Sequence, residues 1–173
     1  MIKYSIYVIL VLFTAFSFTS CLDDNTEEWD KYLEELEEQR KQIYDQFLVD
    51  SLLIVDYLAE NDSMATFDEK NGIFYNIIEP GNDYRPTNYS IVEVKYRGML
   101  LDGTVFDETE GDETADLQLS RVISGWQLGL PKIGAGGNII LYLPSFYGYG
   151  KTAYKTIPAN SVLIFQVELL GIY

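Results

Sequence analysis

The chain has 173 residues, which is enough for one domain with additional segments. Its 27 acidic and 12 basic residues leave a formal net charge of −15, which makes nucleic acids and anionic lipid surfaces poor partners. It contains no His and a single Cys, so Ser-His and Cys-His catalytic pairs and His-based metal sites are excluded.

Residues 1–20 have the pattern of a signal peptide. Lys3 is the only charged residue before Cys21, and residues 6–18 form an apolar run. This run is shorter than the roughly 20 apolar residues that a membrane-spanning helix needs. We therefore expect residues 1–20 to be a targeting segment that takes no part in the fold.

The junction after this segment reads FTSC and ends at Cys21. It resembles a bacterial lipoprotein cleavage site, at which the Cys becomes the lipidated first residue. The resemblance implies a lipid anchor in the bacterial cell envelope, on the outer membrane, at its periplasmic or its surface face. An ordinary secretory signal followed by an unrelated thiol is the alternative. With Cys21 lipidated, no Cys is left for a disulfide, and stability must come from packing.

An acidic segment begins at Cys21 and reads CLDDNT over residues 21–26, with EEWD after it. It resembles the export signals that send some lipoproteins to the outer cell surface. Its composition is equally that of a solvated tether, and the sequence leaves both interpretations open.

Residues 27–63 are predicted to be helical. Apolar residues recur at spacings of three and four, and no Gly or Pro interrupts the pattern. We expect one long helix that stops at Asn61-Asp62-Ser63, with a break near Asp50 as an alternative. Its apolar stripe must be buried against the following domain, against a second copy in a homodimer, or against a client protein.

From about residue 66 the pattern changes to strands and turns. Residues 72–83 are predicted to form a strand that ends in a Pro-Gly turn, and residues 90–106 a hairpin that turns at Asp102-Gly103. After these come a loop with six acidic residues (107–116), a short strand (117–119), a brief helix (120–130) and two strands (138–144 and 161–172). The sum is an α+β domain over residues 66–173, with a mostly antiparallel sheet of five to six strands.

Four motifs of this domain occur in the order of a known family. They are VKYRGMLLDGTVFD, VISGWQLGLPKIGAGG, YGYG and IPANSVLIFQVELL. With these motifs the domain resembles the FK506-binding-protein (FKBP) type of peptidyl-prolyl cis-trans isomerase, and it does not match the motif order of cyclophilins or parvulins. The resemblance implies an FKBP-like antiparallel sheet wrapped around a short helix, with an apolar pocket between them.

The same resemblance implies the residues of the pocket. Trp126 is the expected floor beneath a proline ring, and Ala115 and Leu117 are candidates for one further wall position. The other implied residues are the walls Tyr96, Phe106, Val122, Ile123 and Phe165, the pocket carboxylate Asp107, the hydroxyl of Tyr149 for a ligand carbonyl, and a backbone N–H from Ile157 at the rim. From their spacing alone, Trp126, Val122 and Ile123 would be ordinary core residues of a helix.

The implied chemistry fits the composition of the chain. Rotation about an X-Pro bond is slow because amide resonance is lost in the twisted state, but no covalent bond breaks. The reaction therefore needs no His, metal or cofactor. The expected partners are proline-containing polypeptides, and the expected function is that of a lipid-anchored folding helper. A non-catalytic module that uses the same pocket or the long helix to hold a partner in an envelope complex is the alternative.

Overall fold

The computed structural model describes residues 26–173. The predictions for the signal peptide, for Cys21 and for the acidic tether up to residue 25 lie outside the described residues. The described chain divides between Glu37 and Glu38 into two units. The second unit carries all seven strands of the sheet.

Helix α1 (Thr26–Glu60) is continuous for 35 residues, so the alternative of a break near Asp50 is wrong. Two Glu residues in its first turn lie near the partial positive charge of the helix N-terminus. The helix ends where Asp62 adopts a left-handed backbone with a φ of 50°. Within residues 26–173, no helix has the length and apolar character that crossing a membrane requires.

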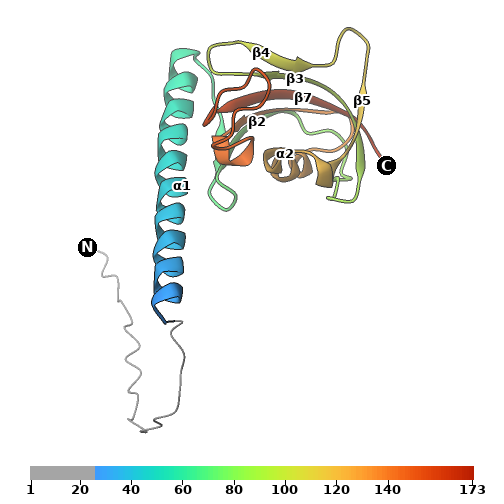
Figure 1. Cartoon of the computed structure of the whole chain (residues 1–173). Helices are drawn as coiled ribbons and strands as arrows, with labels where there is room; N and C mark the ends of the chain where they lie inside the picture. The colour runs from blue at the N-terminus through green and yellow to red at the C-terminus, as the bar shows by residue number, and fades with distance from the viewer. Residues whose placement is uncertain (1–25) are drawn as a thin grey trace, which may run out of the picture. The chain divides into compact units, whose positions relative to one another are not determined.

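After α1, residues 61–173 contain one sheet of seven strands, in which every pair of neighbours is antiparallel (Figure 1). The order is β1-β2-β6-β7-β3-β4, and β5 pairs with β3 beyond this path. The strands are β1 (Thr66–Asp68), β2 (Ile73–Glu79), β3 (Ile91–Met99), β4 (Val105–Glu108), β5 (Ala115–Gln118), β6 (Gly137–Leu143) and β7 (Leu163–Ile172). The predicted α+β class is therefore confirmed, with one short strand, β1, beyond the expected number.

The short helix is smaller than predicted. Helix α2 (Ser124–Gly129) begins only after Val122 and Ile123, which have extended backbones with ψ values of 172° and 149°. Single 3-10 turns flank it at Leu119–Arg121 and Leu130–Lys132. Two β-branched residues in succession favour extended backbone, and this preference outweighed the helical spacing of the apolar side chains.

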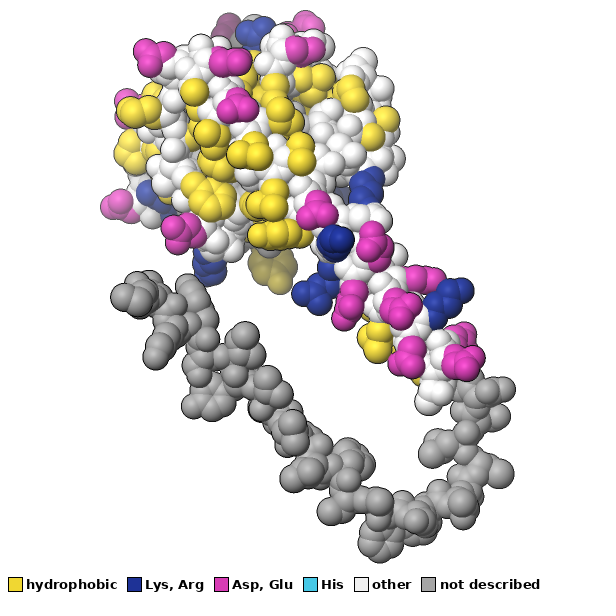
Figure 2. Space-filling view, turned by 90° about the vertical axis from the view of Figure 1, so that its left-hand side faces the viewer, with side chains coloured by type: hydrophobic (Ala, Val, Ile, Leu, Met, Phe, Trp, Pro, Cys, Tyr) yellow, Lys and Arg dark blue, Asp and Glu magenta, His cyan; other side chains and the backbone are white. Residues whose placement is uncertain are grey.

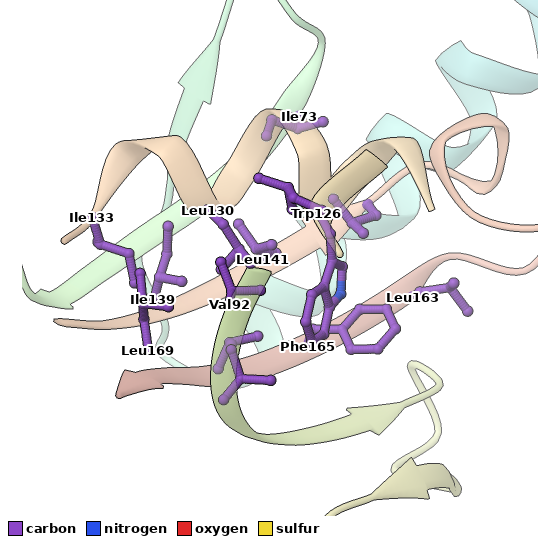
Figure 3. Close-up of a cluster of buried hydrophobic side chains, with 14 of the residues drawn as sticks. Ile73, Val92, Trp126, Leu130, Ile133, Ile139, Leu141, Leu163, Phe165 and Leu169 are labelled. Carbon is purple, nitrogen blue, oxygen red and sulfur yellow. The ribbon is translucent and has the colours of Figure 1, made fainter. Parts of the chain in front are cut away.

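The main core lies between α2 and one face of the sheet (Figure 3). Trp126 and Leu130 pack there with Leu141, and all three side chains are buried. Gly125 allows this close approach, because a Cβ atom at this position would lie 2.4 Å from a methyl group of Leu143 on β6. The helix therefore holds the indole of Trp126 directly against the sheet.

A second core covers the opposite face of the sheet. Its residues alternate along the strands with those of the main core, as the two-residue period of a strand requires. Ile54 of α1 is fully buried there with Phe74 and Tyr142. Of the three predicted partners for the apolar stripe of α1, the domain of the same chain thus covers at least this part.

Other apolar side chains of α1 remain exposed. In the second unit they include Leu48, Val49, Leu52, Leu53 and Val55. In the first unit Trp29, Tyr32 and Leu33 are each more than half exposed, at 62%, 51% and 53%. The space-filling view shows exposed hydrophobic side chains over one face of the domain (Figure 2). Within residues 26–173, the domain does not cover these exposed apolar side chains of α1.

Candidate functional site

A pocket of about 430 Å³ lies between α2 and the sheet. Its size is within the range of about 300–1,000 Å³ that is usual for small-molecule sites. It is lined by Tyr96, Phe106, Asp107, Leu117, Arg121, Val122, Ile123, Trp126, Tyr149, Tyr154 and Phe165. The structure thus brings together eight of the nine residues that the sequence predicted, all except Ile157.

Aromatic rings form the inner part of the pocket in edge-to-face contacts. The indole of Trp126 is 3% exposed and lies 5.3 Å from the ring of Tyr96 and 5.4 Å from that of Phe165, between ring centroids, at 86° and 90°. Phe106 meets Phe165 at 5.5 Å and 81°. Figure 3 shows the indole beside the phenyl ring. Such pairs contribute about 0.5–1.5 kcal/mol each beyond their buried area, so the pocket is preorganised.

Strand pairing places these rings. Gly98 of β3 pairs with Phe165 of β7, and a Cβ atom on Gly98 would lie 2.7 Å from the ring of Phe106 and 2.9 Å from that of Phe165. Any larger residue at this position would push against both phenyl rings. Gly98 is therefore the position at which the backbone of β3 makes room for two walls of the pocket.

The indole Nε1 of Trp126 is buried and has no hydrogen-bond partner among the described residues. An unsatisfied buried donor costs about 1–3 kcal/mol, so a group of this kind in a native structure calls for an explanation other than packing. A Leu or Phe would fill an ordinary core without this cost. The choice of Trp at this position thus favours a role beyond packing.

Three tyrosines line the pocket, and the hydroxyls of two of them, Tyr96 and Tyr149, differ in their hydrogen bonding. Tyr96 donates its hydroxyl to Asp107 Oδ2 at 2.8 Å. Burial, this hydrogen bond and the negative charge of Asp107 together raise the pKa of Tyr96. Burial and the neighbouring Tyr154 and Asp107 raise the pKa of Tyr149. The Tyr149 hydroxyl makes no hydrogen bond within residues 26–173 and stays protonated, so it is a free donor for a ligand.

The predicted rim donor, the N–H of Ile157, is not available. Ile157 is 3% exposed, does not line the pocket, and donates its N–H to the carbonyl of Tyr154 at 2.8 Å. Ile123 offers a donor instead: it precedes the first turn of α2, and its own N–H donates to no group in the described part of the chain. The N–H predicted for the rim, that of Ile157, is thus already bonded, whereas the N–H of Ile123 is free within residues 26–173.

Three lining residues were not among the predicted nine. Leu117 was one of two candidates for a further wall, and it lines the pocket whereas Ala115 does not. Arg121 directly precedes the VISGW motif, a position that could have suggested it. Tyr154 comes from the loop between β6 and β7, where no spacing rule points to it. Tyr154 is 45% exposed, and Asp107 and Arg121 are exposed as well. The pocket therefore opens to solvent at these three residues.

Comparisons with known proteins agree with this geometry. The family model described as FKBP-type peptidyl-prolyl cis-trans isomerase matches residues 82–170. The chain is 42% identical over 103 residues to the FKBP-type isomerase FkpA of Escherichia coli K12, which covers 58% of this chain and 38% of FkpA. It is 39% identical over 107 residues to FK506-binding protein 1A of Aspergillus fumigatus, covering 58% of this chain and 95% of that protein.

A third relative is the outer membrane protein MIP of Legionella longbeachae, 36% identical over 104 residues, with 59% of this chain and 45% of MIP covered. The chain thus spans less than half the length of the FkpA and MIP proteins that it matches. The crystal structure of Escherichia coli FkpA superposes with a TM-score of 0.64 at 29% identity, over 85% of this chain and 72% of FkpA. This similarity confirms the predicted FKBP-like fold with a preceding long helix, and the chain belongs to the FKBP-type peptidyl-prolyl cis-trans isomerase family.

Proposed function

We propose that this chain is a peptidyl-prolyl cis-trans isomerase that accelerates rotation about X-Pro bonds in exported or envelope proteins. The observation that carries the proposal is the solvent-open pocket whose floor is Trp126 and whose walls are aromatic. A flat, rigid and apolar floor suits a proline ring. The family membership supports the same activity.

Exclusion of water is the physical basis of the proposed acceleration. The planar X-Pro amide carries partial charges that water stabilises more than it stabilises the twisted form, and the uncatalysed barrier is about 18–20 kcal/mol. The rings around Trp126 replace water on one side of the bond, which lowers the relative free energy of the twisted state. Each tenfold in rate requires only about 1.4 kcal/mol. Neither a proton transfer nor a cofactor is needed.

Hydrogen bonds at the rim hold the substrate in register. The free hydroxyl of Tyr149 and the free N–H of Ile123 are the donors that we assign to the peptide carbonyls beside the proline. Bonds to flanking carbonyls fix the chain on one side of the rotating bond, so that the pocket geometry favours the twist. The hydroxyl of Tyr96 is committed to Asp107, and its role is to hold that wall.

A protease-coupled assay on tetrapeptides with one proline tests the proposal. The wild-type chain at substoichiometric concentration should accelerate the slow phase of cleavage, which the cis fraction limits. Tyr89→Ala is a matched control, because Tyr89 is 89% exposed and does not line the pocket, and it should be as active as the wild type. Binding of the peptide without acceleration would instead identify a non-catalytic binding module and reject the enzyme.

We also propose that Cys21 carries a lipid that holds the protein in the bacterial cell envelope, on the outer membrane. The FTSC junction supports this, as does similarity to a protein named for the outer membrane. Cells that express the wild type should incorporate labelled palmitate into the protein, and Cys21→Ser should lose the label. Unchanged labelling of the variant would reject the anchor.

We propose that a homodimer forms through α1 and buries the exposed part of its apolar stripe. Leu52 is 65% exposed and lies among other exposed apolar residues of the helix, and such surfaces are often buried by a partner. Light scattering should give the mass of two copies for the wild type and of one copy for Leu52→Glu. A monomeric wild type at micromolar concentration would reject the homodimer.

A further inference from the structure

Asp50 is a fully buried carboxylate on α1, with an exposed fraction of 0%. No Lys or Arg within residues 26–173 forms an ion pair with it. Its Oδ1 accepts a hydrogen bond from Gln46 Nε2 at 2.8 Å, and its Oδ2 accepts two from Ser145, from the N–H at 2.7 Å and from the Oγ hydroxyl at 2.6 Å. A buried charge without a cation is tolerated only where such donors replace water.

Ser145 connects this carboxylate to the loop of the pocket. It begins the 3-10 turn Ser145–Tyr147, which leads directly to Tyr149. Its carbonyl accepts hydrogen bonds from the N–H groups of Gly148 at 2.9 Å and Gly150 at 2.8 Å. Ser145 thus binds Asp50 with its own N–H and hydroxyl and holds the backbone on both sides of Tyr149 with its carbonyl.

One further hydrogen bond joins the same loop to α1, and both elements also border Gly72. Lys151 Nζ donates to Gln42 Oε1 at 2.8 Å, two helical turns before Asp50. The side chains of Phe47 and Tyr147 both approach Gly72, where a Cβ atom would lie 3.1 Å from the Phe47 ring and 2.8 Å from the Tyr147 hydroxyl oxygen. The loop therefore contacts residues 42–50 of α1, and it also carries the pocket residues Tyr149 and Tyr154.

We propose that Asp50 is a positioning residue for the pocket: through Ser145 it holds Tyr149 in the place where its hydroxyl can meet a substrate carbonyl. This inference rests on the proposed isomerase activity for its catalytic consequence. It assigns a role in the site to a segment that the sequence separates from the isomerase domain. In this account α1 supports the pocket wall, in addition to linking the domain to the preceding residues.

The test compares three substitutions with a control on the same helix. Asp50→Ala removes all three acceptor contacts. Asp50→Asn can keep the two from Ser145 with its amide oxygen, and its amide N–H can donate to the side-chain oxygen of Gln46 once the Gln46 amide is turned over. Ser145→Ala removes only the hydroxyl. Ile54→Val is the control, because it loosens the docking of α1 in the second core without removing any of the hydrogen bonds that join α1 to Ser145 and Lys151.

We expect Asp50→Ala to lower kcat/KM about tenfold, mainly through KM, and Ser145→Ala about threefold, because displaced donors bind the substrate less well. Asp50→Asn should stay within about twofold of the wild type, as should Ile54→Val. Hydrogen exchange at the Gly148 and Gly150 amides, measured by NMR, should be faster in Asp50→Ala and Ser145→Ala and unchanged in the other two. Ser145→Ala decides the matter if Asp50→Ala does not fold.

The inference is overturned if both Ser145→Ala and a folded Asp50→Ala leave kcat/KM and the Gly150 exchange rate at the level of Ile54→Val. It is also overturned if Asp50→Asn is as impaired as Asp50→Ala, since the geometry of the contacts would then not be what matters. A wild type without isomerase activity would reject the proposed function alone. The exchange rates of Gly148 and Gly150 would still decide whether Asp50 holds the loop.

Discussion

The ring of Tyr154 stacks on the ring of Tyr149, with centroids 4.5 Å apart and planes within 9° of parallel. The stack fixes the orientation of Tyr149, which lines the pocket. Because both residues come from the loop between β6 and β7, each limits the rotamers of the other. The wall on this side of the pocket is therefore a pair of rings.

We predict that Tyr154→Ala lowers kcat/KM about threefold to tenfold, because Tyr149 loses the ring that orients it and the mouth of the pocket becomes wetter. Tyr154→Phe keeps the stack and should retain nearly the wild-type value. Steady-state kinetics with a proline tetrapeptide measure both variants. If the two variants lose activity equally, the stack does not orient Tyr149.

Gly98 tests the packing of the phenyl walls. Gly98→Ala forces a Cβ atom against Phe106 and Phe165, so we expect a loss of at least tenfold in kcat/KM and of about 1–3 kcal/mol in the free energy of unfolding. Gly171→Ala is the matched control, because the three atoms nearest to its Cβ atom would all belong to the side chain of Tyr173, which is 74% exposed and can move. Equal effects of both substitutions on activity would contradict this assignment.

The raised pKa values of Tyr96 and Tyr149 predict how the protein responds to alkali. A raised pKa means that the folded state keeps both protons above pH 10, the ordinary value for tyrosine. Activity should therefore persist to about pH 10 without a loss from tyrosinate formation. Because the unfolded chain releases these protons first, the free energy of unfolding should fall as the pH rises above 10. Absorbance titration of tyrosinate in the wild type and in Tyr96→Phe measures the tyrosine pKa values. An ordinary tyrosine titration curve for both proteins would contradict the raised pKa values.

The ion pair between Lys132 and Asp68 predicts the response to acid. The hydrogen bond that Asp68 accepts from Lys132, and a second one from the side chain of Asn71, lower the pKa of Asp68 from 3.8 to about 2. A lowered carboxylate pKa gives stability that is present above about pH 4 and is lost as the pH falls toward 2. We expect a loss of about 1–2 kcal/mol in the wild type over this range and a shallower loss in Asp68→Asn, measured by urea unfolding. Parallel curves for the two proteins would reject the contribution of this pair.

Local patterns predicted the parts of the fold that depend on near neighbours. The hairpin at Asp102-Gly103 appears where expected, because Gly103 can take its φ of 83° and Asp102 accepts the N–H of Thr104. The strands predicted at 138–144 and 161–172 likewise appear, as β6 and β7. The helix prediction was wrong for Val122 and Ile123, which lie four and three residues before Trp126. This spacing is typical of an amphipathic helix, but it also occurs when an extended segment directly precedes a helix.

Other features depend on contacts between distant parts of the chain. Asp50 suggested a break in the helix, because an acidic residue among apolar ones gives no hint of a partner 95 residues away in Ser145. Tyr154 has no helical or strand period that would place it in the pocket. The N–H of Ile157 was assigned to the rim by resemblance, and only the bridge between Tyr154 and Ile157 reveals that it is taken.

The most direct test of the account measures rotation itself. Exchange spectroscopy by NMR gives the rate of cis-trans interconversion in a short X-Pro peptide, with no protease and with the protein at catalytic concentration. Trp126→Leu keeps an apolar core residue and removes the flat indole floor, and its folding can be verified by circular dichroism. We predict an exchange rate well above that of the free peptide for the wild type and at least about tenfold less acceleration for the variant. Equal acceleration by the wild type and by folded Trp126→Leu would contradict the account.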